Sequence, residues 1–291
     1  MVIDALLLAV GFAGLIIATF SDIKTREVPD WLNFSLIPAG IGLRLMHSLI
    51  FNDWMFLVYG IAALAAFVCL AYFLYYARQW GGGDSKLLMG IGVIFATYPE
   101  FLLNYFNPIL NWHFLLIFLF NLLLVGAVYA MIWSAYLAVK NRRKFKKAYM
   151  KFFSSLKFFR RIVMVLVAVM LIASLAPVAV EARIFLLGFS LVMLVSFHLM
   201  IFAKVIENCC MFRKIPVSKL TEGDWVVQEV RAQGRYLCGP KDYGLTKEQI
   251  TQLRKTKIKS VLVKEGIPFV PSFLIAMIVS LVWGNVIYML F

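Results

Sequence analysis

The chain has few of the residues on which most catalytic and metal sites depend. Its 291 residues include only 3 histidines and 4 cysteines. His47, His113 and His198 are scattered over different apolar segments or sides, so we expect no Ser–His or Cys–His pair and interpret them as packing or interfacial residues. Cys209 and Cys210 are adjacent, which is too close for a metal-binding pair, and no second pair exists. The sequence therefore predicts no metal site and no cofactor.

Charged residues are also scarce. They make up 15% of the chain, whereas apolar residues make up 63%, and the mean hydropathy is +0.86. This composition excludes a soluble globular protein. The net charge of +14 would suit nucleic acid, but the basic residues lie in blocks between apolar runs, as they do in membrane proteins. We therefore expect anionic membrane lipids, and no nucleic acid, as partners of this charge.

Eight apolar segments approach the roughly 20 residues that a helix needs to cross a bilayer. The predicted fold class is an α-helical integral membrane protein with about eight transmembrane helices. The fourth segment is short and rich in glycine, and it could continue towards Leu103. The predicted spans are Val2–Phe20, Trp31–Ile50, Met55–Tyr76, Leu87–Tyr98, Trp112–Val139, Ile162–Val180, Ile184–Ile206 and Phe269–Leu290.

The basic residues also predict how these spans are oriented. With the N-terminus outside the cell, nearly all Lys and Arg residues fall on the cytoplasmic side, where basic loops are retained. The exceptions are Arg44, inside the second span, and Arg183, in a short outer turn. We therefore expect a multi-pass protein of the cytoplasmic membrane with both termini outside. The basic and aromatic residues of 140–159 predict an amphipathic segment at the inner surface.

One long polar segment interrupts the membrane pattern. Residues 207–268 predict a small α+β cytoplasmic insert between a membrane domain of residues 1–206, which holds seven spans, and a last span in 269–291. The insert contains no catalytic constellation, and we expect it to act on substrate access or specificity. The alternative is a structural brace between the last two spans. Its expected elements are a strand at Trp225–Val230, a helix that opens at Thr246 with Gln249 as its capping-box partner, and a strand at Ile258–Val263.

Two aspartates lie at the mouths of membrane helices. Asp22 follows the first span, and Asp84 follows three glycines at the start of the fourth. Two spans separate them, so both carboxylates return to the same side of the membrane. Carboxylates at a lipid boundary are costly and indicate function. Two close carboxyl groups share a proton, so one can activate a water while the other protonates a carbonyl oxygen, which is the chemistry of aspartyl proteolysis.

Each aspartate also has a simpler interpretation. Asp84 would serve as the N-cap of a helix that begins at Ser85, and the glycines would be a flexible turn. Asp22 would be a solvated charge just after a helix end. The functional interpretation of the glycines is a backbone that an extended substrate can approach closely.

The residues around both aspartates resemble a known family. The stretch Asp22-Ile-Lys24-Thr-Arg-Glu-Val28-Pro29 resembles the D-x-[KR]-x(3)-[IV]-P motif of type IV prepilin peptidases. The stretch Gly81-Gly-Gly83-Asp84 matches their GxGD motif, with Lys86 two residues later. The stretch from Pro268 to Pro271 resembles the entry to their last span. The resemblance covers most of residues 1–105 well and the rest only in outline.

This resemblance implies an archaeal prepilin or preflagellin (prearchaellin) peptidase. Such enzymes are membrane aspartyl endopeptidases that remove short basic leader peptides from pilin-like or archaellin precursors at the cytoplasmic face. The resemblance assigns catalysis to Asp22 and Asp84, without a metal or cofactor. It gives motif or substrate-positioning roles to five further residues, namely Gly81, Gly83, Lys24, Pro29 and Lys86. A cysteine-bearing N-terminal domain and a nucleotide-type glycine fingerprint are both lacking, so we expect no methyltransferase activity.

Two alternatives stay open. A presenilin-like or signal-peptide-peptidase-like intramembrane protease shares GxGD but usually has Tyr-Asp in its first motif, whereas Ser21 precedes Asp22 here. A non-enzymatic transporter or scaffold would be expected to place ionisable groups near the bilayer midplane, often in repeated halves, and the sequence shows neither feature.

Overall fold

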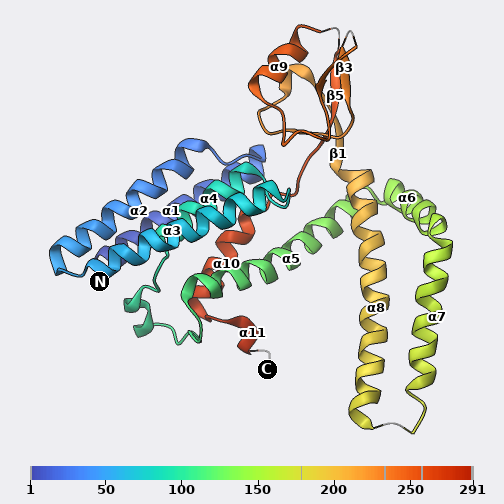
Figure 1. Ribbon diagram of the computed structural model, residues 1–291, viewed down its shortest axis with the longest axis horizontal. Helices are drawn as coiled ribbons and strands as arrows, with labels where there is room; N and C mark the ends of the chain where they lie inside the picture. The colour runs from blue at the N-terminus through green and yellow to red at the C-terminus, as the bar shows by residue number, and fades with distance from the viewer. Residues whose placement is uncertain (1, 178, 233, 257, 290–291) are drawn as a thin grey trace.

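The computed structural model describes residues 2–177, 179–232, 234–256 and 258–289, which form three parts with separate cores (Figure 1). The first is a bundle of α1–α5 and α10, the second a hairpin of α6–α8, and the third the small insert. The helices are α1 (Val2–Thr25), α2 (Asp30–Phe51), α3 (Trp54–Tyr76), α4 (Gly82–Ile94), α5 (Phe114–Lys140), α6 (Arg142–Ser155), α7 (Lys157–Ala173), α8 (Val180–Ile206), α9 (Lys247–Arg254), α10 (Val270–Val282) and α11 (Val286–Met289).

Five helical segments in the described part of the chain are long and apolar enough to cross a membrane. They are α1, α2, α3, α5 and the segment Val180–Met211 that contains α8. The predicted class, a helical multi-pass membrane protein with a small strand-containing region, is confirmed. The other three predicted spans are shorter helices, with 13 residues in α4, 17 in α7 and 13 in α10. Residues 178 and 290, which two predicted spans include, lie outside the described residues.

The fourth predicted span is wrong at both ends. Helix α4 begins at Gly82, five residues earlier than expected, and ends at Ile94 instead of reaching Tyr98 or continuing towards Leu103. The cause of the early end is Arg44 on α2, which is fully buried and donates hydrogen bonds to the carbonyls of Val93 (2.7 Å) and Ile94 (3.2 Å). These carbonyls have no partner within a helix that stops there. The buried arginine therefore lets α4 end inside the bundle.

Helix α10 also ends early, after half the length of the expected span. Gly284 has a φ of 74° and pairs with Ile109 in an isolated β-bridge. The Ile109 N–H donates to the Trp283 carbonyl at 3.0 Å, and the Asn121 amide of α5 donates to the Gly284 carbonyl at 2.7 Å. Non-helical backbone at membrane depth requires such partners within the protein. Both α4 and α10 are therefore half-length helices whose ends are satisfied by polar groups of neighbouring segments.

Small residues let α4 lie close to its neighbours. A Cβ atom on Gly90 would lie 2.8 Å from Leu36 of α2, and a Cβ atom on Gly92 would lie 2.8 Å from Phe67 of α3. Helices in membranes pack closely through small residues of this kind. The glycines of α4 therefore fix its place between α2 and α3.

The predicted amphipathic segment forms α6. Phe145 and Phe153 face α8, with ring centroids 5.6 Å from Phe202 and 6.4 Å from His198. The basic residues of α6 are mostly exposed on its other side. The amphipathic interpretation of this segment is confirmed, and α6 connects the bundle to the other two helices of the hairpin, α7 and α8 (Figure 1).

The insert contains the described strands. They are β1 (Phe212–Pro216), β2 (Trp225–Val226), β3 (Val230–Ala232), β4 (Arg235–Cys238) and β5 (Ser260–Lys264). The order β1–β5–β2 forms one antiparallel sheet, and β3 and β4 form a separate hairpin.

Most predicted elements of the insert are found, with shifted bounds. The expected strand at Trp225–Val230 is wrong, because β2 ends at Val226 and Val230 begins the hairpin. Strand β5 begins two residues later than expected. The capping box at the start of α9 is confirmed, with the Thr246 N–H donating to Gln249 Oε1 at 2.9 Å. The division at residues 207 and 268 stays a prediction.

Candidate active site

Asp22 lies where the end of α1 meets the start of α10. It belongs to the last turns of α1 and is only 6% exposed, so the interpretation as a solvated charge after the helix is wrong. Its Oδ2 accepts a hydrogen bond of 2.9 Å from the N–H of Val270, the first residue of α10. First-turn N–H groups have no partner within their own helix and attract negative charge. The half-length helix α10 therefore holds the Asp22 carboxylate.

Asp84 occupies the first turn of the other half-length helix. Gly81 is the N-cap of α4, so the expectation that Asp84 caps a helix beginning at Ser85 is wrong. The Asp84 carboxylate interacts with the backbone of Gly81 and with the charge of Asp22. The structure thus brings together the two aspartates that the sequence marks, each beside the N-terminus of a short helix.

The two motifs are also in direct contact. Gly83 lies against Val28, which is buried, so that a Cβ atom on Gly83 would be 3.3 Å from the Val28 backbone nitrogen and 3.4 Å from its Cβ. At such distances, a side chain on Gly83 would require the backbone at Val28 to move by a few tenths of an ångström. Gly81 has more space, since its nearest neighbour would be Asp84 Oδ2 at 3.6 Å. The contact between Gly83 and Val28 sets the distance between the end of α1, which carries Asp22, and the start of α4, which carries Asp84.

This contact predicts that Gly83→Ala lowers peptidase turnover by about tenfold, because small displacements of reacting groups are costly. Gly82→Ala is the matched control. It adds the same methyl group to the same helical turn, yet its nearest neighbour is Tyr75 at an ordinary 3.8 Å. Cleavage rates of a precursor by both purified variants test the prediction, and equal activity of the two would contradict it.

The other predicted motif residues support the two loops. Pro29 is the N-cap of α2, and its carbonyl accepts the N–H of Leu32 at 3.1 Å. Lys86 forms an ion pair of 2.6 Å with Asp30, which joins the start of α4 to the start of α2. Lys24 is exposed in the last turn of α1. Within the described part of the chain, none of these three forms a hydrogen bond or ion pair with the aspartate carboxylates.

Three further residues at the site were not predicted from the sequence, and a fourth, Arg26, was expected only as a basic residue near the pair. Val270 supplies its backbone N–H, and Trp80 packs against Phe269 and Phe273 at ring-centroid distances of 5.7 and 5.3 Å. Tyr129 of α5 lies close enough for the charge of Asp22 to act on it, and Arg26 lies over the Trp133 ring at 5.2 Å. Among the three unpredicted residues, only Val270 had a signal in the sequence. It lies between Pro268 and Pro271, and proline favours the start of a helix.

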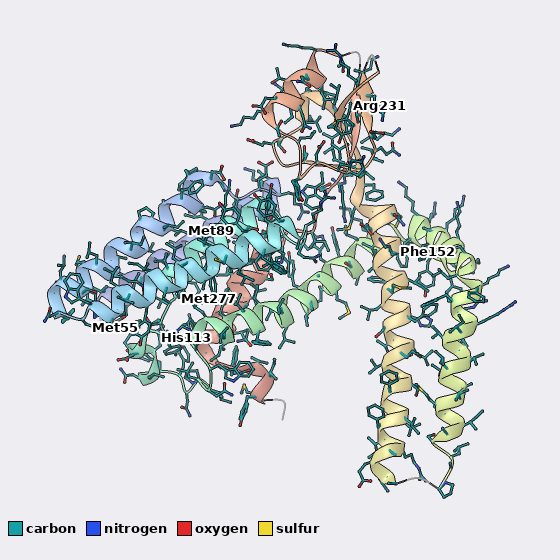
Figure 2. All side chains as sticks on the ribbon, in the orientation of Figure 1. Met55, Met89, His113, Phe152, Arg231 and Met277 are labelled. Carbon is teal, nitrogen blue, oxygen red and sulfur yellow. The ribbon has the colours of Figure 1, made fainter. Side chains whose placement is uncertain are left out.

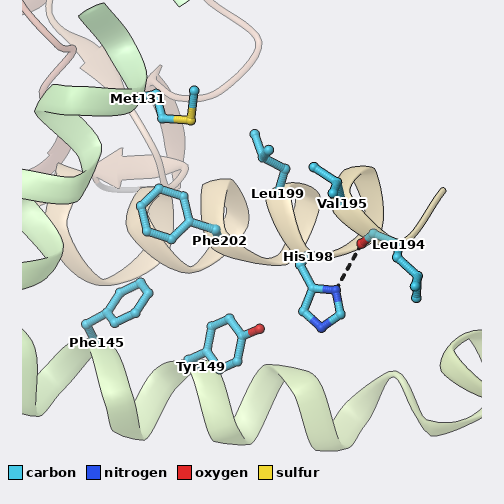
Figure 3. A pocket seen from close by; sticks show the side chains of 8 residues that line it. All are labelled: Met131, Phe145, Tyr149, Leu194, Val195, His198, Leu199 and Phe202. Carbon is cyan, nitrogen blue, oxygen red and sulfur yellow. Dashed lines mark hydrogen bonds between the residues drawn. The ribbon is translucent and has the colours of Figure 1, made fainter. Parts of the chain in front are cut away.

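A separate apolar pocket of about 580 Å³ lies between α5, α6 and α8 (Figure 3). Neither aspartate lines it. Its His198 forms a 2.9 Å hydrogen bond with the Leu194 carbonyl of its own helix, as a packing residue would. His113 lies at the start of α5, far from Phe152 on α6 and from Arg231 in the insert (Figure 2). His113 and His198, which packs against Phe153 of α6, therefore lie at separate places.

Comparisons with known proteins agree with the two motifs. Residues 9–131 match the model of the type IV leader peptidase family. The chain is 31% identical over 106 residues to a preflagellin peptidase of Methanocaldococcus jannaschii, which is 36% of this chain and 45% of that protein. It is 28% identical over 138 residues to a preflagellin peptidase of Methanococcus voltae, which is 46% of this chain and 57% of that protein.

A prepilin peptidase, EppA, of Methanothermobacter thermautotrophicus is 26% identical over 157 residues, which cover 52% of this chain and 40% of that protein. The chain thus spans about half the length of the curated relatives it matches. No solved structure matches it significantly. The matched region contains both aspartates, both motifs and helices α2 to α4 entire. Residues 9–131 of this chain are therefore similar to the type IV leader peptidase family.

Proposed function

We propose that the protein is a membrane aspartyl endopeptidase that removes short basic leader peptides from pilin-like or archaellin precursors at the cytoplasmic face of the membrane. The observation that carries the proposal is the contact of the two motifs, in which Gly83, next to Asp84, lies against Val28 of the loop that follows Asp22. The family match of residues 9–131 supports the same activity. The names of the relatives, preflagellin and prepilin peptidases, support the substrate class.

In the proposed reaction, a water molecule lies between the two carboxyl groups. The ionised carboxylate takes a proton from the water as its oxygen attacks the carbonyl carbon of the scissile bond. The protonated carboxyl group gives its proton to the carbonyl oxygen. The tetrahedral intermediate then collapses, the C–N bond breaks, and the amine leaves with a proton from the dyad. The Val270 N–H holds one oxygen of Asp22, so the carboxylate is oriented before the substrate arrives.

The place of the two aspartates suits a substrate whose cleavage site lies just before an apolar helix. Both are close to helix ends of the bundle, beside the polar insert, while the bodies of the helices are apolar (Figure 1). A precursor helix in the bilayer would hold its basic leader at this boundary. The carboxylate of Glu27 is exposed on the loop after α1 and suits a basic peptide.

The proposed activity can be tested with membranes that contain the full-length protein. Candidate pilin and archaellin precursors are incubated with these membranes, and mass spectrometry determines the cut site. Cleavage directly after a basic leader and before the apolar helix is expected. Cleavage within the apolar helix would instead support an intramembrane protease, and no cleavage of any precursor would refute the proposed activity.

The orientation gives a second prediction. We expect Lys255→Cys in the insert to react with a membrane-impermeant maleimide only after cells are permeabilised, because basic loops stay inside. Leu175→Cys, between α7 and α8, is the control that should react in intact cells, since Leu175 is 83% exposed. Both variants require the native cysteines to be replaced. Cys238 is buried and cannot report on the insert. The reverse labelling pattern would overturn the orientation.

A further inference from the structure

The insert contacts the loop that leads to Asp84. Arg78, three residues before Gly81, donates hydrogen bonds to the carbonyls of Pro240 (3.0 Å) and Lys241 (2.9 Å) in the loop after β4. Its guanidinium group also lies over the Tyr243 ring at 4.8 Å. The Tyr243 ring therefore lies against the face of the guanidinium group, and the two carbonyls accept hydrogen bonds at its edge. Guanidinium groups bind well in this combined arrangement.

The insert also contacts the loop that follows Asp22. Arg26 lies four residues after Asp22, and its Nε is 3.7 Å from Glu265, which directly follows β5. Arg213 of β1 pairs with the same carboxylate at 2.7 Å. Five residues after Glu265, the Val270 N–H binds Asp22 itself. The last strand of the insert is therefore joined to the proposed catalytic site by both a side-chain contact and a short stretch of chain.

The backbone at both arginines is unusual. Arg26 and Arg78 have φ values of 63° and 57°, in the left-handed region that residues with side chains rarely adopt. Arg26 follows the end of α1 and Arg78 follows the end of α3, and the insert contacts the side chain of each. Such conformations persist where surrounding contacts fix them. Asn52 is the third described non-glycine residue with a positive φ. It follows the C-terminal end of α2, whereas Pro29 precedes the N-terminal end of the same helix.

We propose that the insert is a clamp that fixes the loop after α1 and the loop after α3 relative to each other, with Arg26 and Arg78 as positioning residues for Asp22 and Asp84. The inference rests on the proposed function. A brace between the last two membrane helices would need contacts only with α8 and α10, which the insert connects in the chain. The insert does contact the end of the α8 segment, where Lys264 pairs with Glu207 at 2.6 Å, but its other contacts go to the loops after α1 and α3, which a brace would not need. Positioning then depends on a part of the chain that lies beyond the family match of residues 9–131.

The test compares three substitutions at Arg78 in the full-length protein. Arg78→Ala is expected to lower kcat about tenfold with little change in KM, because the dyad is misplaced while the leader still binds. Arg78→Gly accepts the left-handed backbone without strain but lacks the guanidinium group, so it should be as slow as Arg78→Ala. Arg78→Lys should recover part of the lost kcat, since an ammonium group can still reach a carbonyl. Asn52→Gly, the matched control, should leave kcat unchanged.

Three results would overturn the clamp. Wild-type kcat in Arg78→Gly would mean that only backbone conformation matters at this position. A raised KM with unchanged kcat would mean that Arg78 or the insert grips the leader. Wild-type kinetics in Arg78→Ala would mean that the contacts with the insert have no effect on the site.

Removal of the insert provides a second comparison. Phe212 and Lys264 are paired neighbours across β1 and β5, so a linker of a few residues can replace 213–263 without moving the ends. The shortened protein should have a lower kcat, and Arg78→Ala should cause no further loss in it, because the partner of the arginine is already absent. A full additional loss would place the role of Arg78 outside the insert and overturn the clamp.

A readout that needs no activity separates this inference from the proposed function. Backbone hydrogen exchange of residues 77–84 and 22–30 should become faster in Arg78→Ala, and stay unchanged in Asn52→Gly. If exchange is faster in Arg78→Ala but the wild-type protein cleaves no precursor, the clamp is supported and the leader-peptidase activity is refuted. Unchanged exchange in an active Arg78→Ala variant would refute the clamp alone.

Discussion

Asp22→Asn and Asp84→Asn are each expected to abolish leader cleavage, with a loss of at least about 10³-fold in kcat, while the protein stays folded in the membrane. An amide cannot take the proton from water or supply one to the carbonyl oxygen, and general acid–base groups contribute about 10²–10⁴-fold each. Because the two carboxyl groups act as a unit, the double variant should be no slower than either single variant.

The structure explains why the loss should be chemical. The side-chain amide introduced by Asp22→Asn keeps a carbonyl oxygen that can accept the Val270 N–H, so the junction between α1 and α10 is retained. Asp53→Asn is the matched control, since Asp53 caps α3 by accepting the Met55 N–H at 3.1 Å and asparagine caps equally well. The measurement is the rate of precursor cleavage by purified variants, alongside their thermal unfolding. Substantial turnover by either single variant would remove the dyad from the mechanism.

The meeting of the two aspartates follows from features that a sequence carries. Counting the spans between Asp22 and Asp84 is enough to put them on one side of the membrane, and the count requires no knowledge of packing. The motif glycine Gly83 could likewise be marked in advance, because a close approach is the usual reason for glycine at such a place. Its partner, Val28, lies far away in sequence and became known only from the fold.

Other parts of the site have no local signal. The composition of the chain predicts how many apolar segments it has, but it does not predict where a helix ends inside the protein. The ends of α4 and α10 depend on Arg44, Asn121 and the Ile109–Gly284 bridge, which come from other segments. The group of Val270 that binds Asp22 is its backbone N–H, so the identity of the Val270 side chain does not indicate this contact. The contacts of Arg26 and Arg78 with the insert are equally non-local, and a basic residue near the membrane looks like any other topology-setting charge.

The second large effect is expected at Arg44, whose replacement should destabilise the whole bundle. The side chain is 0% exposed and donates four hydrogen bonds, to the carbonyls of Val93, Ile94 and Phe56 and to the Thr97 hydroxyl. Arg44→Met has a similar length and no donor, so it leaves these acceptors buried without partners. Each unsatisfied buried group costs about 1–3 kcal/mol, and relaxation recovers part of the sum, so we expect a fall of about 3 kcal/mol in the free energy of unfolding.

Unfolding in detergent micelles, followed by circular dichroism, measures the effect. Arg183→Met is the control, because Arg183 is exposed near the start of α8, and its loss should change stability by less than about 0.5 kcal/mol. Gly60→Ala reaches the same site from α3, since its new methyl group would collide with the Arg44 side chain, and it should destabilise the bundle as well. If Arg44→Met were as stable as the wild type, the end of α4 would not depend on the arginine. The expected displacement of α4 would also move Asp84 at its start, so precursor cleavage should fall in any fraction of the variant that remains folded.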